Sequence, residues 1–376
     1  MLILLPEDVR GIISINEAVQ ATEIGFRDWG NNKALNAPRR RVHCPSGVRV
    51  TVHQGGAPSL GMTGYFEHTE IPVAYEDRQE QIHRAHPIYM LLDSETGERR
   101  CLIIGEVTLS EMPDLYATTG VRTAATSIVG TAALARADAE TVGVLGSGRQ
   151  ARQHLLGICK VRRIKKVKAY RRDLEQRRIF AEEMRQVLNV EVMPVASPEE
   201  AVKGMDIILA ATNSATPVLD GRWLAPGQHL SSIVGSNIGY LSWAKVMSPT
   251  YTAKKRRELD DETLKRADVV VVSSRDQAVQ DQQGDLFDPV QAGILNWDDI
   301  ADLGEVLAGV RPGRTSDNQI TLFKNNAGQG IADVAIGAYI YAKARERGLG
   351  VEFPIGLPTY FGEAYPRSGM ATVHSN

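Results

Sequence analysis

The sequence of 376 residues has few cysteines. Its three cysteines, Cys44, Cys101 and Cys159, lie far apart. They match no metal-binding spacing and do not suggest a disulfide framework. We therefore expect the protein to reside in the reducing cytoplasm.

Long apolar runs and a strong net charge are also lacking. No apolar run reaches the roughly 18 residues that suggest a membrane-spanning helix, so we expect no membrane association. The first residues, MLILLPEDVRGI, have no basic segment ahead of the apolar ones and soon meet Pro6 and Glu7, which is atypical of a signal peptide. The formal net charge of −2 gives no reason to expect nucleic acid as a partner.

Between residues 141 and 320, apolar strand-like runs alternate with helical patterns. The strand-like runs are TVGVLG (141–146), KKVKAY (165–170), VEVMPV (190–195), DIILAAT (206–212), HLSSIVGS (229–236) and ADVVVVSS (267–274). Strands that alternate with helices indicate a parallel sheet, and strands that are apolar throughout indicate helices on both faces. The pattern predicts an α/β fold with a doubly wound parallel sheet.

The flanking regions show other patterns. Helical spacing of apolar residues predicts helices over 15–29, 121–136 and 331–348, and short β-like runs lie at 48–53 and 88–93. The charged stretch from 70 to 86 is irregular and predicts a long loop. Because the chain is long for one core, we predict two domains. They are a Rossmann domain over 125–320 and an α+β dimerisation and substrate domain formed by 1–124 and 321–376.

The segment VGVLGSGRQA (142–151) follows a predicted strand and opens a predicted helix. This is the context that a G-x-G-x-x-A motif requires to bind a dinucleotide. The first glycine permits the sharp turn, the second lets the backbone approach a pyrophosphate, and the alanine lets the helix pack on the strand. The helix start would present free N–H groups to the phosphates. The predicted contacts are Gly146, Ser147, Gly148, Arg149 and Gln150.

The end of the second strand of this unit indicates which coenzyme binds. An acidic residue usually stands there to hold the ribose of NAD, but this chain has Arg171 and Arg172, followed by Asp173. Guanidinium groups suit a 2′-phosphate. We therefore favour NADP(H), with NAD(H) possible if Asp173 rather than Arg171 meets the ribose.

Two later strands end in small polar residues. ATNS (211–214) and VGSN (234–237) each follow a predicted strand, and ligands bind at the carboxyl ends of such strands. We expect Thr212, Asn213, Gly235 and Ser236 to contact the nicotinamide and its ribose.

Several segments together resemble the ornithine cyclodeaminase/mu-crystallin family. They are RTAATSIVGTAALA (122–135), ETVGVLGSGRQARQHL (140–155), the stretch 256–286 and, above all, the stretch 303–350. The resemblance implies a homodimer in which the non-Rossmann domains pair. It also implies NAD(P)-dependent chemistry on small-molecule imines or amino acids.

The resemblance also assigns residues. The family holds the substrate carboxylate with an arginine two residues after a proline, and here Arg40 takes that position after Pro38, within three consecutive arginines. Arg122 matches a second arginine of the site, which faces substrate or coenzyme, and Thr123 beside it is expected to contact the coenzyme. By position, His86 precedes the strand that lines the nicotinamide and is expected to contact coenzyme or substrate.

Two family residues are missing. A lysine that touches the substrate is replaced by Thr63 in the segment GMT, and the nearby Tyr65 or His68 is our candidate proton donor. Cyclodeaminases also use an aspartate on the second strand-end loop, where this chain has Asn237. An amide can orient a substrate but cannot act as a base, which argues against ornithine cyclisation.

We therefore predict an NADP(H)-dependent oxidoreductase that reduces an imine to an amine or oxidises an amino acid. One alternative is a cyclodeaminase that recycles bound NAD. Another is a protein that retains NADPH and binds a small molecule, as mu-crystallin does, which the aromatic Tyr240, Trp243 and Tyr251 would favour. No histidine pair has the i,i+4 spacing of a helical metal site, so we expect no metal.

Overall fold

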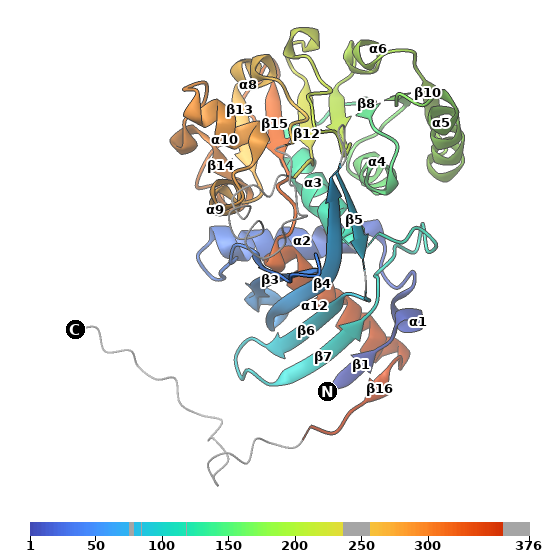
Figure 1. Ribbon diagram of the computed structural model, residues 1–376, viewed down its shortest axis with the longest axis vertical. Coiled ribbons are helices and arrows are strands. Elements are labelled where there is room, and N and C mark those ends of the chain that lie inside the picture. Colours follow the sequence, from blue (N-terminus) through green and yellow to red (C-terminus); the bar gives the residue numbers. More distant parts are fainter. Residues whose placement is uncertain (75–78, 84, 118, 236–255, 356–376) are drawn as a thin grey trace, which may run out of the picture.

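The computed structural model describes residues 1–74, 79–83, 85–117, 119–235 and 256–355. The strands in these ranges form two sheets, which Figure 1 shows one above the other. No helix in these ranges is long and apolar enough to cross a membrane.

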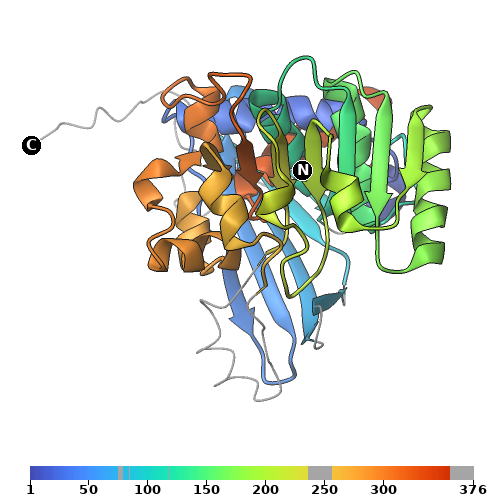
Figure 2. The same cartoon turned by 90° about the horizontal axis from the view of Figure 1, so that it is seen from above.

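The second sheet along the chain is entirely parallel, as the strand and helix alternation predicts. Its order is β10-β9-β8-β11-β12-β15-β13-β14. Its strands are β8 (Thr141–Leu145), β9 (Lys166–Tyr170), β10 (Glu191–Pro194), β11 (Ile207–Ala210), β12 (His229–Ser232), β13 (Val269–Val272), β14 (Ala301–Asp302) and β15 (Thr321–Lys324). Figure 2 shows helices on both faces of this sheet. The strand order reverses between β8 and β11, and this is where such sheets bind ligands.

Helices connect most of the parallel strands. They are α4 (Arg149–Val161), α5 (Leu174–Leu188), α6 (Pro198–Val202), α8 (Asp261–Arg266), α9 (Arg275–Gln280), α10 (Gly284–Gln291) and α11 (Leu303–Leu307), with short 3₁₀ turns at Gly221–Trp223 and Trp297–Asp299. The predicted domain boundary at 320 cuts this unit too early, because β15 lies inside the parallel sheet.

The first sheet has the order β16-β1-β7-β6-β4-β3-β2, with β5 paired to β4. Its strands are β1 (Leu2–Leu4), β2 (Arg40–His43), β3 (Arg49–Ala57), β4 (Met62–Ala74), β5 (Gln79–His83), β6 (Ile88–Asp93), β7 (Arg99–Ile104) and β16 (Val351–Glu352), and a 3₁₀ turn, Pro58–Leu60, joins β3 to β4. The loop predicted over 70–86 was therefore wrong in large part, since β4 and β5 pair there as antiparallel strands. Charged and polar residues along both strands hid the apolar alternation that marks a strand.

Helices α1 (Pro6–Val9), α2 (Ile15–Gly30), α3 (Gly120–Leu134) and α12 (Gly330–Arg347) complete the fold. Ser14 and Glu17 form a capping box at the start of α2, and Lys343 of α12 also binds Glu17, at 2.7 Å. Helix α12 packs on β3, β4 and α2. It begins so close to β3 that a Cβ on Gly330 would lie 2.2 Å from the backbone of Gln54, so only glycine fits there.

Candidate functional site

A cavity of about 200 Å³ lies between the first sheet and the carboxyl ends of the parallel strands. The parallel sheet and its neighbours contribute Arg122, Thr123, Gln150, Thr212, Gly235 and Arg256 to its walls. The first sheet contributes Arg39, Arg41, Arg49, Thr51, His53, His68 and Glu70. One wall therefore carries the glycine-rich motif region, and the opposite wall carries cationic and imidazole groups.

Strand register determines which side chains of the first sheet meet the cavity. Arg41 pairs with Thr51, which pairs with His68, so these three form one row across β2, β3 and β4. Residues directly opposite on neighbouring strands share a face, and residues two apart along a strand do so too. Arg49 and Glu70 form the next row.

Because successive side chains of a strand point to opposite faces, Arg40 lies on the face of β2 that is turned away from the cavity. Its side chain is exposed and does not line the cavity, whereas Arg39 and Arg41 do. The structure therefore replaces the predicted Arg40 with its two neighbours as the arginines of the cavity. Tyr65 likewise lies on the opposite face of β4 from the buried Phe66 and His68, because successive side chains of a strand point to opposite faces. Of the two candidate proton donors, only His68 lines the cavity.

A buried carboxylate from the Rossmann side binds both Arg39 and Arg41. Asp281 receives hydrogen bonds from Arg39 and from Arg41, the latter at 2.8 Å. Burial opposes ionisation of Asp281, but the two guanidinium groups outweigh it and lower its pKa. The two sheets are thereby joined at the cavity by buried ion pairs.

A second buried network joins Arg122, His53 and Asp333. Arg122 Nε donates to Asp333 Oδ1 at 2.8 Å, and His53 Nδ1 lies 2.9 Å from Asp333 Oδ2. Burial raises the pKa of Asp333 to about 6 despite Arg122. Burial, followed by Arg122, lowers the pKa of His53 well below its usual value. Asp333 and His53 were not predicted from the sequence, because they lie 280 positions apart and meet only in the fold.

The loop after β8 has the geometry of a dinucleotide site. Gly146 has φ +107°, and a Cβ on it would lie 2.3 Å from the Ala211 carbonyl oxygen. Gly148 is the N-cap of α4, without a side-chain cap, and a Cβ there would meet nothing within 4 Å. The Gln150 side-chain oxygen is buried without a hydrogen-bond partner among the described residues. Open space, uncapped N–H groups and an unsatisfied amide suit a pyrophosphate and its ribose.

The arginines after β9 lie beside this loop. Arg171 donates to the Ser147 side chain at 3.1 Å, and Arg172 is exposed. Asp173 caps α5 by accepting from the Gln176 N–H at 2.8 Å. The acidic side chain is therefore engaged in capping, and Arg171 is the residue in contact with the loop.

The strand-end loops are supported by Glu258, which the sequence analysis also missed. Its buried carboxylate accepts from the backbone N–H and the hydroxyl of Thr212, and from the backbone N–H groups of Ile233 and Val234. Burial raises the pKa of Glu258. Thr212 and Gly235 line the cavity. Asn213 is exposed beside them.

Other predicted residues lie elsewhere. Ser236 and Asn237 lie outside the described residues, as does the aromatic segment with Trp243. His86 is exposed and lines a separate hollow with Glu106 and other residues. Arg149 is also exposed and donates to the Tyr116 carbonyl at 3.1 Å.

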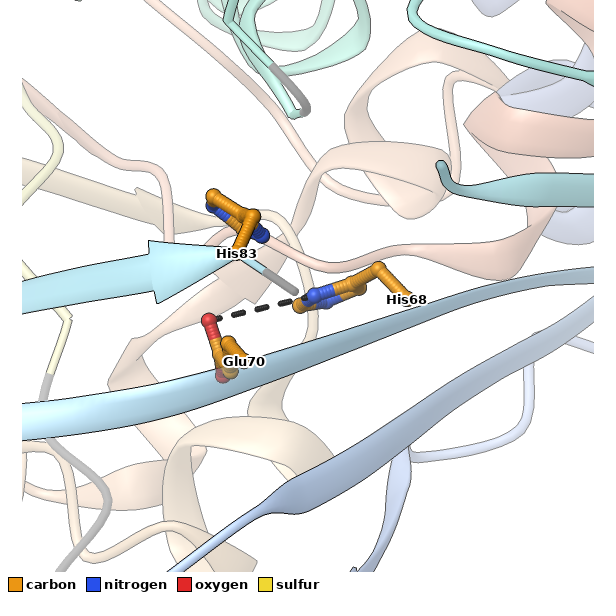
Figure 3. A group of neighbouring side chains, drawn as sticks. All are labelled: His68, Glu70 and His83. Carbon is orange, nitrogen blue, oxygen red and sulfur yellow. Dashed lines mark ion pairs between the residues drawn. The ribbon is translucent and has the colours of Figure 1, made fainter. Parts of the chain in front are cut away.

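One group of side chains could hold a metal ion. His68, Glu70 and His83 point toward one another (Figure 3), with candidate ligand atoms within 4.8 Å of one another. The group lies on two paired strands, so the helical i,i+4 spacing on which we predicted no metal does not reveal it.

Comparisons with known proteins agree with this geometry. A Delta(1)-pyrroline-2-carboxylate reductase from Bacillus cereus is 29% identical over 357 residues, covering 94% of this chain and all of that protein. The solved Delta(1)-pyrroline-2-carboxylate reductase of Thermococcus litoralis, in complex with NADH and L-proline, has a TM-score of 0.76 at 28% identity, covering 94% of this chain and all of that one.

An archaeal alanine dehydrogenase dimer with bound NAD has a TM-score of 0.75 at 25% identity, covering 95% of this chain and 99% of that one. All three relatives extend over both sheets described above. Residues 1–348 match one family along their whole length. The resemblance noted in the sequence is thus confirmed, and the chain belongs to the ornithine cyclodeaminase/mu-crystallin family.

Proposed function

We propose that this chain is an NADP(H)-dependent oxidoreductase that reduces the C=N bond of an imino acid, either a ketimine or a cyclic imine, or oxidises the corresponding amino acid. The cavity carries this proposal, because it joins a dinucleotide loop to a wall of arginines and histidines. The names of the relatives, reductases of a cyclic imino acid among them, support the same class.

In this proposal the coenzyme lies along the carboxyl edge of the parallel sheet. The α4 N-terminus and Gly148 receive the pyrophosphate, and Thr212 and Gly235 flank the nicotinamide end. When bound, the coenzyme supplies or accepts the hydride. Glu258 fixes the strand-end loops and so acts as a positioning residue for that end of the site.

The substrate carboxylate would be held by Arg41 and Arg39, with Arg122 nearby, because guanidinium groups bind carboxylates in a two-pronged geometry. We assign proton transfer to the buried pair of His53 and Asp333, because the His53 ring lines the cavity and its Nδ1 lies 2.9 Å from Asp333, whose pKa burial raises to about 6. His68 is the alternative donor from the same wall. Either histidine would replace the lysine that this chain lacks.

Adjacent arginines on β2 provide a matched test. Arg41→Gln removes a cavity guanidinium, and Arg40→Gln removes an exposed one. The assay follows loss of NADPH absorbance with two cyclic imines that differ only in a carboxylate. A hydrogen bond to a charged group contributes about 1.5–3 kcal/mol. R41Q should therefore raise KM for the carboxylate-bearing imine at least tenfold and leave the other imine unaffected.

The opposite pattern, with R40Q impaired and R41Q normal, would restore the original assignment of Arg40. No turnover of any imine, together with ammonia release from ornithine or lysine, would indicate the cyclodeaminase. Tight NADPH retention with no turnover of either kind would indicate a binding protein. Either of the last two outcomes would overturn the proposed reduction, whereas the first would overturn only the assignment of Arg41.

We also propose a homodimer formed through the first sheet. Val42 and Ile82 are 64% and 45% exposed, and both lie near the β2 and β5 edges of this sheet. Exposed apolar side chains on strands favour association. Sedimentation of the full chain should give twice the monomer mass, and Val42→Asp should shift it toward the monomer.

A further inference from the structure

Four histidines with little access to water are found on the first sheet. His43, His53 and His68 are buried, and His83 is half-buried at the end of β5. The proposed reduction assigns proton transfer to His53, with His68 as the alternative, and His43 and His83 have no role in it. His68 and His83 differ from the rest in having a carboxylate between them.

The register of β3, β4 and β5 builds this group. Glu70 of β4 pairs directly with His83 of β5, and His68 stands two residues before Glu70 on the same strand. All three side chains therefore project from one face. Figure 3 shows them converging from the two strands, and their ligand atoms lie within 4.8 Å of one another.

Both imidazoles have an unsatisfied nitrogen. Nδ1 of His68 and Nδ1 of His83 are buried and have no hydrogen-bond partner among the described residues. Buried polar atoms are normally satisfied, so two such atoms in one group require an explanation. The His68 and His83 rings are 5.6 Å apart between centroids.

Arg49 holds the Glu70 carboxylate in place. Arg49 Nε donates to Glu70 Oε1 at 2.8 Å, while Oε2 faces His68, 3.8 Å from its Nδ1. Arg49 therefore fixes the carboxylate with one oxygen toward the His68 ring.

We propose that His68, Glu70 and His83 form a binding site for a divalent transition metal ion of the zinc class. Two imidazoles and one carboxylate are a recurrent ligand set for such ions. Bonds of about 2.1 Å to one ion place its ligands at most about 4 Å apart, so small side-chain rotations suffice to close the group. Arg49, which already donates to Glu70, would keep the carboxylate oriented toward the ion.

The proposed site opens onto the cavity, because His68 and Glu70 are part of its wall. Three protein ligands leave at least one position of a tetrahedral ion for water or an anion. Arg49 already balances the charge of Glu70. A divalent ion would therefore bring two positive charges to this wall, and a carboxylate is a suitable fourth ligand.

The test measures metal binding directly on the full chain after treatment with a chelator. Zn²⁺ is titrated by calorimetry, and Co²⁺ is titrated by its visible absorption, which reports nitrogen and oxygen ligands. We expect one ion per chain for the wild type. His68→Gln and His83→Gln should each weaken binding at least tenfold. His86→Gln, at an exposed histidine of the same segment, is the matched control and should bind as the wild type does.

Absence of saturable binding by the wild type would overturn the proposal, as would unchanged binding in both variants. If H68Q fails to fold, H83Q decides, because His83 lies half-buried at the end of a strand paired on one side only. The site does not depend on the proposed function. Imine reduction without metal binding would refute only the site, and metal binding without turnover would refute only the reduction.

Discussion

The coenzyme preference can be tested at a single arginine. Arg171 follows β9 and contacts Ser147 of the glycine-rich loop at 3.1 Å. In NADPH the 2′-phosphate belongs at the end of this second strand. We expect Arg171→Ala to weaken NADPH binding and to leave NADH binding nearly unchanged.

The magnitude follows from the exposure of the side chain. A hydrogen bond to a charged group contributes about 1.5–3 kcal/mol, and each 1.4 kcal/mol corresponds to about a factor of ten in affinity. Arg171 is only half-buried, so solvent screening favours the lower end. The ratio of NADPH affinity to NADH affinity should fall by about 10- to 30-fold.

The assay is a titration of each coenzyme followed by its fluorescence, with Arg178→Ala as control. Arg178 is exposed on α5, so its removal changes the net charge equally without touching the loop. A ratio that is unchanged in R171A would refute the assignment of Arg171. A wild type that prefers NADH would refute the NADP(H) proposal itself.

Three further predictions concern stability. Lys324 and Asp285 form an ion pair with no exposed side-chain surface, so Lys324→Met should lower the free energy of unfolding in urea by about 3 kcal/mol; a loss below about 1 kcal/mol would contradict this. Gly146→Ala should lower the melting temperature because φ is +107° and a Cβ would clash, whereas Gly148→Ala should retain stability and weaken only coenzyme binding. Burial opposes ionisation of Glu17, but hydrogen bonds from Lys343 and Ser14 outweigh it and lower its pKa from 4.5 to about 2. The ionised Glu17 therefore stabilises the folded state fully above pH 4.5, and this stabilisation is lost as the pH falls toward 2. Glu17→Gln should lower the free energy of unfolding by about 1 kcal/mol at neutral pH, a modest amount because the side chain is 31% exposed and solvent screens its charge. The variant should also lose less stability than the wild type between pH 4.5 and pH 2 in urea unfolding; an equal loss would contradict the assignment.

The parallel sheet could be predicted because its signals are local. Each strand is a short apolar run, and the turn at Gly146 is specified by its immediate neighbours. The coenzyme loop depends on the same short stretch. These features need no knowledge of which distant residues meet.

The substrate wall could not be predicted in the same way. Arg39, Arg40 and Arg41 are chemically identical, and only the pairing of Arg41 with Thr51 decides which of them face the cavity. A shift of one residue would exchange the two faces. The pairing of Glu70 with His83 likewise depends on strand register, and spacing along the chain does not reveal it.

The start of helix α12 against β3 has a consequence for biosynthesis. The first sheet acquires its covering helix, and the cavity acquires Asp333, only after residues 330–347 have been translated. Strand β1 likewise pairs with β16 near residue 351. A ribosome-bound chain can form the β8–β11 unit early, whereas the strands of the first sheet must remain incompletely packed until residues 330–347 have emerged. Contacts of such long sequence separation slow folding, so chaperone dependence during synthesis should be concentrated in the first hundred or so residues.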